Sequence, residues 1–216
     1  MPVSMNCVRR WWPNPWWIGP LRLLGGFAAL LALGCAAMAI DAELDEAQAI
    51  AELRQGGHIV YLRHAARFKG PRENLTVSSS AAEFANCSAQ RNLTPTGQEQ
   101  ARQLGRYWRE LGIPVARVVA SAQCRTRDTA ILAFGQAELE QRLFDLDFLR
   151  ALLLKPAAAK GNTVIVGSDA QLRELTGVDL GYAELAIVQP DGKGGIQVVA
   201  RLDLEDWQEA AEPGWW

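Results

Sequence analysis

A short apolar run that ends in two reactive side chains stands out early in the sequence. Residues 58–64 read His-Ile-Val-Tyr-Leu-Arg-His and follow a Gly-Gly pair. Such a run is typical of a buried parallel strand, and open α/β sheets bind ligands at the carboxyl ends of these strands. Arg63 offers a fixed cation with a forked donor set suited to phosphate, and a neutral His64 is a nucleophile. Taken alone, the pair also fits an exposed strand end.

A second arginine lies where a helix is expected to begin. Residues 118–121 read as a short strand, and residues 121–130 continue as a helix. Arg125 falls in its first turn, where backbone N–H groups and the helix dipole favour anions. Arg67 lies in the long polar segment 65–92. It is either a solvated cation or the rim of a phosphate pocket, and the segment is long enough to be functional.

The segments around these side chains alternate between helical and extended patterns. Helices are expected over residues 41–55, from Pro95 to about Leu111 with Thr94 as N-cap, over 148–157 and over 170–175; further strands are expected over 163–167, 184–189 and 196–202. The last two strands flank Pro-Asp-Gly-Lys-Gly-Gly and predict a hairpin. The alternation predicts an α/β fold of three layers, α/β/α, in which a largely parallel sheet carries helices on both faces.

Three motifs occur in a characteristic order along these segments. Residues 62–65 read Leu-Arg-His-Ala, residues 92–97 read Asn-Leu-Thr-Pro-Thr-Gly, and residues 121–130 place Ser, Arg and Thr-Ala in the spacing Ser-x-x-x-Arg-x-x-x-Thr-Ala. No single motif is specific, but the ordered set resembles the histidine phosphatase (phosphoglycerate mutase-like) superfamily over most of residues 57–203. The resemblance implies the phosphoglycerate mutase-like fold.

The resemblance also implies phosphomonoester hydrolysis through a phosphohistidine, without metal or other cofactor. His64 would attack phosphorus while Arg63 and Arg125 hold the non-bridging oxygens. A carboxylic acid would protonate the leaving oxygen. Asp145 is the first candidate and Asp147 the second, although either residue is equally suited to cap the following helix. The chain has only two histidines, so a histidine-based metal site is not expected.

The sequence departs from the family pattern at a second catalytic position. Family members continue the strand 163–167 with a histidine, whereas this chain continues with Ser168-Asp169. Ala66 replaces an acidic residue often found two positions after the nucleophile. A serine hydroxyl donates one hydrogen bond but carries no charge, so weakened activity is expected. The alternative is a pseudophosphatase that binds a phosphorylated ligand or partner without turnover. Relatives with larger domains use an aspartate in the position of Asp169 as proton donor.

The N-terminal residues predict export. A basic pair at 9–10, an apolar run at 21–33 and small residues at 37–39 fit a signal peptide over residues 1–39, followed by one domain over 40–216. Lipidation at Cys35, an uncleaved membrane anchor and twin-Arg export are alternatives. The expected location is periplasmic or extracellular, and contact with a membrane is expected only through this segment.

Charge and cysteine content bear on the expected ligand and on a possible disulfide. The chain has 22 basic and 24 acidic residues and a net charge of −2, which leaves no electrostatic footprint for nucleic acid. The expected ligand is phosphate or a phosphorylated small molecule, whose identity the sequence does not indicate. Beyond the leader the chain has two cysteines, Cys87 and Cys124, each next to a predicted pocket element. A disulfide between them is predicted, with two buried thiols as the alternative.

Overall fold

The sheet is mostly parallel and ends in an antiparallel hairpin. The computed structural model describes residues 43–158 and 160–212, so the predicted leader lies outside the described residues. The strands are β1 (Ile59–Arg63), β2 (Val115–Ala120), β3 (Glu138–Leu139), β4 (Asn162–Gly167), β5 (Leu185–Pro190) and β6 (Ile196–Leu202), in the order β3-β2-β4-β1-β5-β6. The first four run parallel to one another, and β5 pairs antiparallel with β1 and β6. The predicted fold class is confirmed.

The expected helices are present, but the first begins at Glu46 rather than at residue 41, because Asp45 is its N-cap. They are α1 (Glu46–Gln55), α2 (Ala81–Ala85), α3 (Pro95–Glu110), α4 (Cys124–Phe134), α5 (Leu146–Leu153), α6 (Asp169–Thr176) and α7 (Leu204–Ala211), with short 3-10 turns η1 (Cys87–Ala89) and η2 (Gln141–Phe144). Thr94 caps α3 by accepting a hydrogen bond from the backbone N–H of Gly97 at 3.0 Å, which satisfies one of the free donors at a helix start. Of the described residues, none lies in a helix long and apolar enough to cross a membrane.

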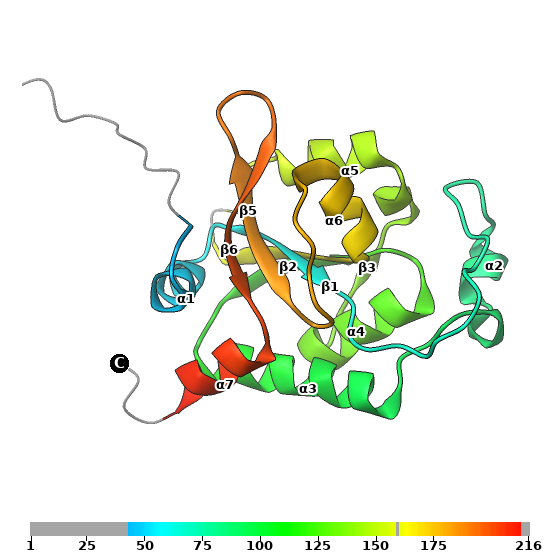
Figure 1. Cartoon of the computed structure of the whole chain (residues 1–216), viewed down its shortest axis with the longest axis horizontal. Helices are drawn as coiled ribbons and strands as arrows, with labels where there is room; N and C mark the ends of the chain where they lie inside the picture. Colours follow the sequence, from blue (N-terminus) through cyan, green and yellow to red (C-terminus); the bar gives the residue numbers. More distant parts are fainter. Residues whose placement is uncertain (1–42, 159, 213–216) are drawn as a thin grey trace, which may run out of the picture. The chain divides into compact units, whose positions relative to one another are not determined.

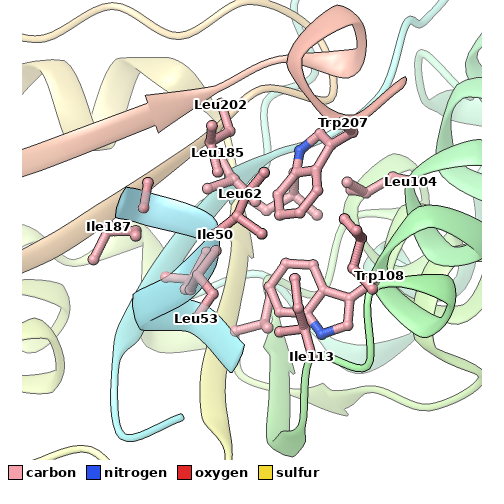
Figure 2. Close-up of a cluster of buried hydrophobic side chains, with 14 of the residues drawn as sticks. Ile50, Leu53, Leu62, Leu104, Trp108, Ile113, Leu185, Ile187, Leu202 and Trp207 are labelled. Carbon is pink, nitrogen blue, oxygen red and sulfur yellow. The ribbon is translucent and has the colours of Figure 1, made fainter. Parts of the chain in front are cut away.

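Alternation along the strands divides the apolar side chains between two layers. In β1, Val60 and Leu62 join the core beneath α1, α3, α4 and α7, whereas Ile59 and Tyr61 join the core beneath α5 and α6. Figure 1 shows α3 and α7 on one side of the sheet and α5 and α6 on the other. In the first core Trp108 and Trp207 pack with ring centroids 5.5 Å apart (Figure 2).

The amino ends of the central strands are joined by a buried amide. Asn162 is fully buried, and its Nδ2 donates to the carbonyls of Leu53 (2.7 Å) and Pro114 (3.0 Å), while its Oδ1 accepts from the backbone N–H of His58 (3.1 Å). A buried polar side chain costs stability unless it is hydrogen-bonded, and this one is satisfied. It fixes the entry into β1, and therefore the direction in which β1 delivers its last residues.

The two edge strands of the sheet differ: β3 is very short, and β6 is partly covered. The outer strand β3 has only two residues, and its Glu138 forms an exposed ion pair with Arg117 at 2.7 Å. At the other edge, the backbone N–H of Leu44 donates to the carbonyl of Val199 in β6 at 2.6 Å, and Glu43 approaches Arg201 within 3.7 Å. The segment before α1 therefore covers part of β6.

Candidate active site

Three neighbouring strand ends bring the candidate residues together. Strands β2, β4 and β1 are adjacent and parallel, so their carboxyl ends meet at one edge of the sheet. His64 follows β1, and its backbone N–H donates to Gly167 at the end of β4 (2.9 Å). Ser168 follows β4, and Arg125 lies in the first turn of the helix after β2. All three line a cavity of about 230 Å³, as expected for a ligand site at strand ends.

His64 is held in the neutral form that a nucleophile requires. The residue is 2% exposed; its Nδ1 lies 2.8 Å from the carbonyl oxygen of Ala65, and its Nε2 lies 3.2 Å from Nε of Arg125. Because the carbonyl and the guanidinium each allow only one role, Nδ1 carries the proton and Nε2 keeps the lone pair. Burial lowers the pKa of His64 to about 3; the Ala65 hydrogen bond opposes this, and the charges of Arg125, Arg63 and Arg67 add to it.

The two residues after His64 are clamped by two helices. The N–H of Ala65 donates to Oγ1 of Thr129 in α4 (3.1 Å), and the N–H of Ala66 donates to Oε1 of Gln100 in α3 (2.9 Å). A Cβ on Gly97 would lie 1.8 Å from the carbonyl oxygen of Ala66. Only glycine permits this approach of α3, which gives a physical reason for the Leu-Thr-x-x-Gly motif.

Four of the residues that line the cavity are arginines. Arg125 has a side chain only 5% exposed, and burial lowers its pKa to about 10, so it remains charged at neutral pH. Arg67 and Arg72, both from the segment after His64, also line the cavity. Arg67 donates to the carbonyl of Phe68 at 3.1 Å, a contact that leaves its charge uncompensated. The arrangement suits a small anion.

Arg63 does not line this cavity. Its Nη1 donates to the carbonyl of Leu180, its Nε lies 3.6 Å from Oδ1 of Asp169, and its guanidinium stacks over the ring of Tyr182 at 4.2 Å. The structure therefore brings Arg67 and Arg125 to the cavity of His64, and it directs the Arg63 side chain toward Leu180 and Tyr182. Tyr182 also lies near His64, with ring centroids 5.7 Å apart.

The carboxylates expected to act as proton donor occupy different places. Asp145 is exposed and caps α5, accepting from the N–H groups of Asp147 (2.9 Å) and Phe148 (3.1 Å). The capping interpretation therefore describes the observed role of Asp145, which is not among the residues lining the cavity. Asp169 lines the cavity, at the start of α6.

Ser168 lies where the second histidine was expected. Its carbonyl accepts a hydrogen bond from the hydroxyl of Tyr61 (2.8 Å), which fixes its backbone. Ser168 is the N-cap of α6, yet its side chain makes no capping hydrogen bond. Within residues 43–158 and 160–212 its hydroxyl has no hydrogen-bond partner, so it is available to a ligand in the cavity.

Two charged residues of the cavity have no signal in the sequence. Glu73 has a side chain only 3% exposed, and its carboxylate accepts from Arg125 (3.0 Å) and from Arg91 (2.7 and 3.0 Å). Burial raises the pKa of Glu73, but hydrogen bonds from Arg91 and the charge of Arg125 outweigh it and hold the pKa at about 2. Neither Glu73 nor Arg91 lies in a periodic element or a motif, so sequence patterns did not single them out.

The predicted disulfide is confirmed and joins the long loop to the arginine helix. Cys87 in η1 is bonded to Cys124, the first residue of α4, with Cα atoms 5.8 Å apart. Gln90 strengthens this junction, because its Oε1 accepts from the N–H of Cys124 (3.0 Å) and its Nε2 donates to the carbonyl of Phe84 (2.8 Å). Among the described residues, no group of three or more His, Cys, Asp or Glu side chains could hold a metal ion.

Comparison with known families finds the same superfamily over part of the chain. The model of the histidine phosphatase superfamily (branch 1) matches residues 84–152. The structure of the protein histidine phosphatase SixA complexed with tungstate is 15% identical, with 69% of this chain and 98% of that chain covered and a TM-score of 0.48. A phosphoserine phosphatase from Entamoeba histolytica in complex with 3-phosphoglyceric acid is 12% identical, with 69% and 98% covered and a TM-score of 0.47. No curated protein sequence matches the chain.

Proposed function

Taking the match to the histidine phosphatase superfamily as the premise, we propose that the protein hydrolyses phosphomonoesters through a phosphohistidine at His64. The observation that carries this proposal is the state of His64, which is neutral, buried and unprotonated on Nε2 in a cavity lined by Arg67 and Arg125. A lone pair beside fixed cations is the arrangement that in-line attack on a phosphoryl dianion needs.

The reaction proceeds in two displacements. In the first, the Nε2 lone pair of His64 forms a bond to phosphorus while the ester P–O bond breaks and the leaving oxygen takes a proton from an acid. In the second, water attacks phosphorus, the P–N bond breaks, and the water proton returns to the conjugate base. Phosphoryl oxygens replace Nε2 as the acceptor of the Arg125 N–H group, and Arg125 and Arg67 offset the charge that builds on them.

Asp169 is the proton donor in this proposal. It lines the cavity, whereas Asp145 is exposed and engaged as a helix cap. The Asp169 side chain is 25% exposed and lies 3.6 Å from guanidinium nitrogens of both Arg63 and Arg173, so neighbouring cations hold it beside the cavity. We expect Asp169→Asn to lower kcat, with a larger loss for esters whose leaving groups are poor.

Turnover is expected to be slow because of Ser168. Loss of one preorganised donor at a developing anion typically costs about 10²–10³ in rate, and a hydroxyl also lacks the charge of a protonated histidine. The same observation favours a second candidate function, a pseudophosphatase that binds a phosphorylated ligand without turnover. The contact between Arg125 and the lone pair of His64 also fits that role.

The test compares wild type with three variants on an aryl phosphate and measures phosphate release and phosphohistidine by mass spectrometry after rapid denaturation. We expect slow turnover, a gain of at least about tenfold in Ser168→His, a loss in Asp169→Asn and no phosphohistidine in His64→Ala. Turnover that persists in His64→Ala would exclude the proposed mechanism. Vanadate binding without phosphohistidine, and no gain in Ser168→His, would establish the pseudophosphatase.

We also propose that the protein acts outside the cytoplasm. The basic and apolar composition of residues 1–39 supports export, and the disulfide supports an oxidising compartment. Fractionation of cells that express the full chain, with the redox state of Cys87 and Cys124 measured by thiol alkylation, tests this. Recovery of the reduced protein in the cytoplasmic fraction would contradict it.

A further inference from the structure

A carboxylate inside a cavity for anions requires an explanation. Of the residues that line the cavity, four are arginines, and an anionic ligand would be repelled by Glu73. Yet Glu73 is directed at the arginine nearest the nucleophile, with its Oε1 3.0 Å from Nη1 of Arg125. Because Nε of Arg125 is 3.2 Å from Nε2 of His64, these three side chains form a continuous chain from the loop to the nucleophile.

Hydrogen bonds from Arg91 hold the carboxylate of Glu73 in place. Its Oε1 accepts from the backbone N–H (2.6 Å) and Nε (3.0 Å) of Arg91, and its Oε2 accepts from Nη2 of the same residue (2.7 Å). This is the bidentate fork by which arginine holds carboxylates, reinforced by a backbone donor. The segment that carries Arg91 is itself tied to α4 through the Cys87–Cys124 disulfide.

We propose that Glu73 is a positioning residue, which Arg91 holds in place so that it orients the Arg125 guanidinium toward His64 and the cavity. The inference rests on the proposed function, because it assigns Arg125 to the phosphoryl group. Arginine has several rotatable bonds, and ordering such a side chain costs conformational entropy. A fixed carboxylate behind the guanidinium restricts it before the ligand arrives.

The geometry favours this role over competition between Glu73 and the ligand. A competing carboxylate would have to leave when phosphate binds, and Glu73 would then give up four hydrogen bonds, which include its ion pairs with Arg91 and Arg125. Its contact uses a single N–H of Nη1, so Nη2 of Arg125 remains for a phosphoryl oxygen, and Nε becomes available when the ligand replaces Nε2 of His64 as its acceptor. Glu73 neutralises part of the positive charge of the cavity. Arg67 and Arg72 replace that positive charge for an anionic ligand.

The test uses Glu73→Gln, which keeps the shape of the side chain but removes its charge and directs an amide group toward cationic donors. Vanadate affinity is measured by calorimetry, and the pKa and tautomer of His64 are measured by ¹⁵N NMR, where His58 gives the only other histidine signal of the chain. We expect the vanadate Kd to rise at least about tenfold, by analogy with the loss of metal affinity when an outer-shell partner of a metal ligand is removed. The ¹⁵N signal of Nε2 of His64 should shift, because Arg125 moves away and its 3.2 Å hydrogen bond to this atom is lost.

Glu138→Gln is the matched control, because it breaks an exposed pair with Arg117. In this pair Nη2 (2.7 Å) and Nε (2.9 Å) of Arg117 donate to one carboxylate oxygen of Glu138. Both readouts should stay at wild-type values in this variant. Glu73→Asp keeps the charge but shortens the side chain. This variant should give values of both readouts between those of wild type and Glu73→Gln. If Glu73→Gln does not fold, Glu73→Asp serves as the test.

Three outcomes overturn the proposal. Tighter vanadate binding in Glu73→Gln would identify Glu73 as a competitor. An unchanged vanadate Kd, or an unchanged ¹⁵N signal of Nε2 of His64, would show that Arg125 is positioned without Glu73. Failure of the proposed function is distinguishable, because wild type would then form no phosphohistidine, whereas the NMR signals of His64 still report whether Glu73 holds Arg125.

Discussion

The neutral state of His64 makes the stability of the protein depend on pH below about 6.5. Burial lowers the pKa of His64 to about 3 in the folded protein, and an unfolded histidine has a pKa of about 6.5. As the pH falls below 6.5, the unfolded chain binds a proton at this residue while the folded protein does not. Acid therefore favours unfolding, and the stability gained above pH 6.5 is lost progressively down to about pH 3.

The size of the effect follows from the two pKa values. Between pH 8 and pH 5 the single group lowers the free energy of unfolding by about 2 kcal/mol, because each pH unit within the window is worth about 1.4 kcal/mol. Urea unfolding of wild type and His64→Gln at both pH values isolates this contribution, since His58 and the carboxylates are common to both proteins. Phosphate-free buffers are needed because a bound anion would stabilise the folded state.

We expect the stability of wild type to fall by about 2 kcal/mol more than that of His64→Gln between the two pH values. Equal losses in the two proteins would refute the reasoning. They would mean that His64 is protonated in the folded protein at pH 5, and that its Nε2 is not a free nucleophile under mildly acidic conditions.

Three further predictions concern the parts that surround the nucleophile. Gly97→Ala should cost about 1–3 kcal/mol by overpacking and weaken vanadate binding, because its Cβ would displace the carbonyl of Ala66; chemical unfolding and calorimetry measure the two effects. Removing the disulfide in a Cys87→Ser, Cys124→Ser variant should lower stability by about 3–4 kcal/mol, given a sequence separation of 37, as thermal unfolding would show. Asp145→Ala should cost about 1 kcal/mol through loss of the cap and leave kcat/KM for an aryl phosphate unchanged.

Each of these has a result that would contradict it. Wild-type vanadate affinity in Gly97→Ala would mean that α3 does not control the segment after His64. An equally stable double serine variant would mean that hydrogen bonds alone hold the loop. A fall in kcat/KM in Asp145→Ala, at full occupancy of the folded state, would return the proton-donor role to Asp145.

The sequence predicted the elements whose periodicity and caps agree with the tertiary structure. The strand before His64, the cap and proline that begin α3, and the hairpin formed by β5 and β6 all follow from local patterns. The two-residue strand β3 carries no periodicity, and α7 follows a short capping sequence at Asp203 that the apolar pattern around Trp207 did not disclose. These elements depend on pairing and packing with distant segments.

The candidate site was predictable only where a side chain is fixed by its place on an element. His64 and Arg125 follow strand ends or begin a helix, and topology alone brings them together. The direction of Arg63 depends on Leu180 and Tyr182, which lie more than a hundred residues away in the sequence. Glu73 belongs to an irregular loop, whose path is decided by individual tertiary contacts.

The covering of β6 by the segment before α1 affects whether this strand can pair with another chain. An open sheet edge offers unpaired backbone groups that can pair with another chain, and proteins limit this by short, charged or covered edges. Here one edge ends in the brief, charged β3, and the other is partly occupied by the backbone of Leu44. Proteolysis after Leu44 would uncover β6 and create a site for self-association, whereas cleavage after residue 39 leaves the cover attached. We therefore expect the residues before α1 to limit pairing of β6 with another chain.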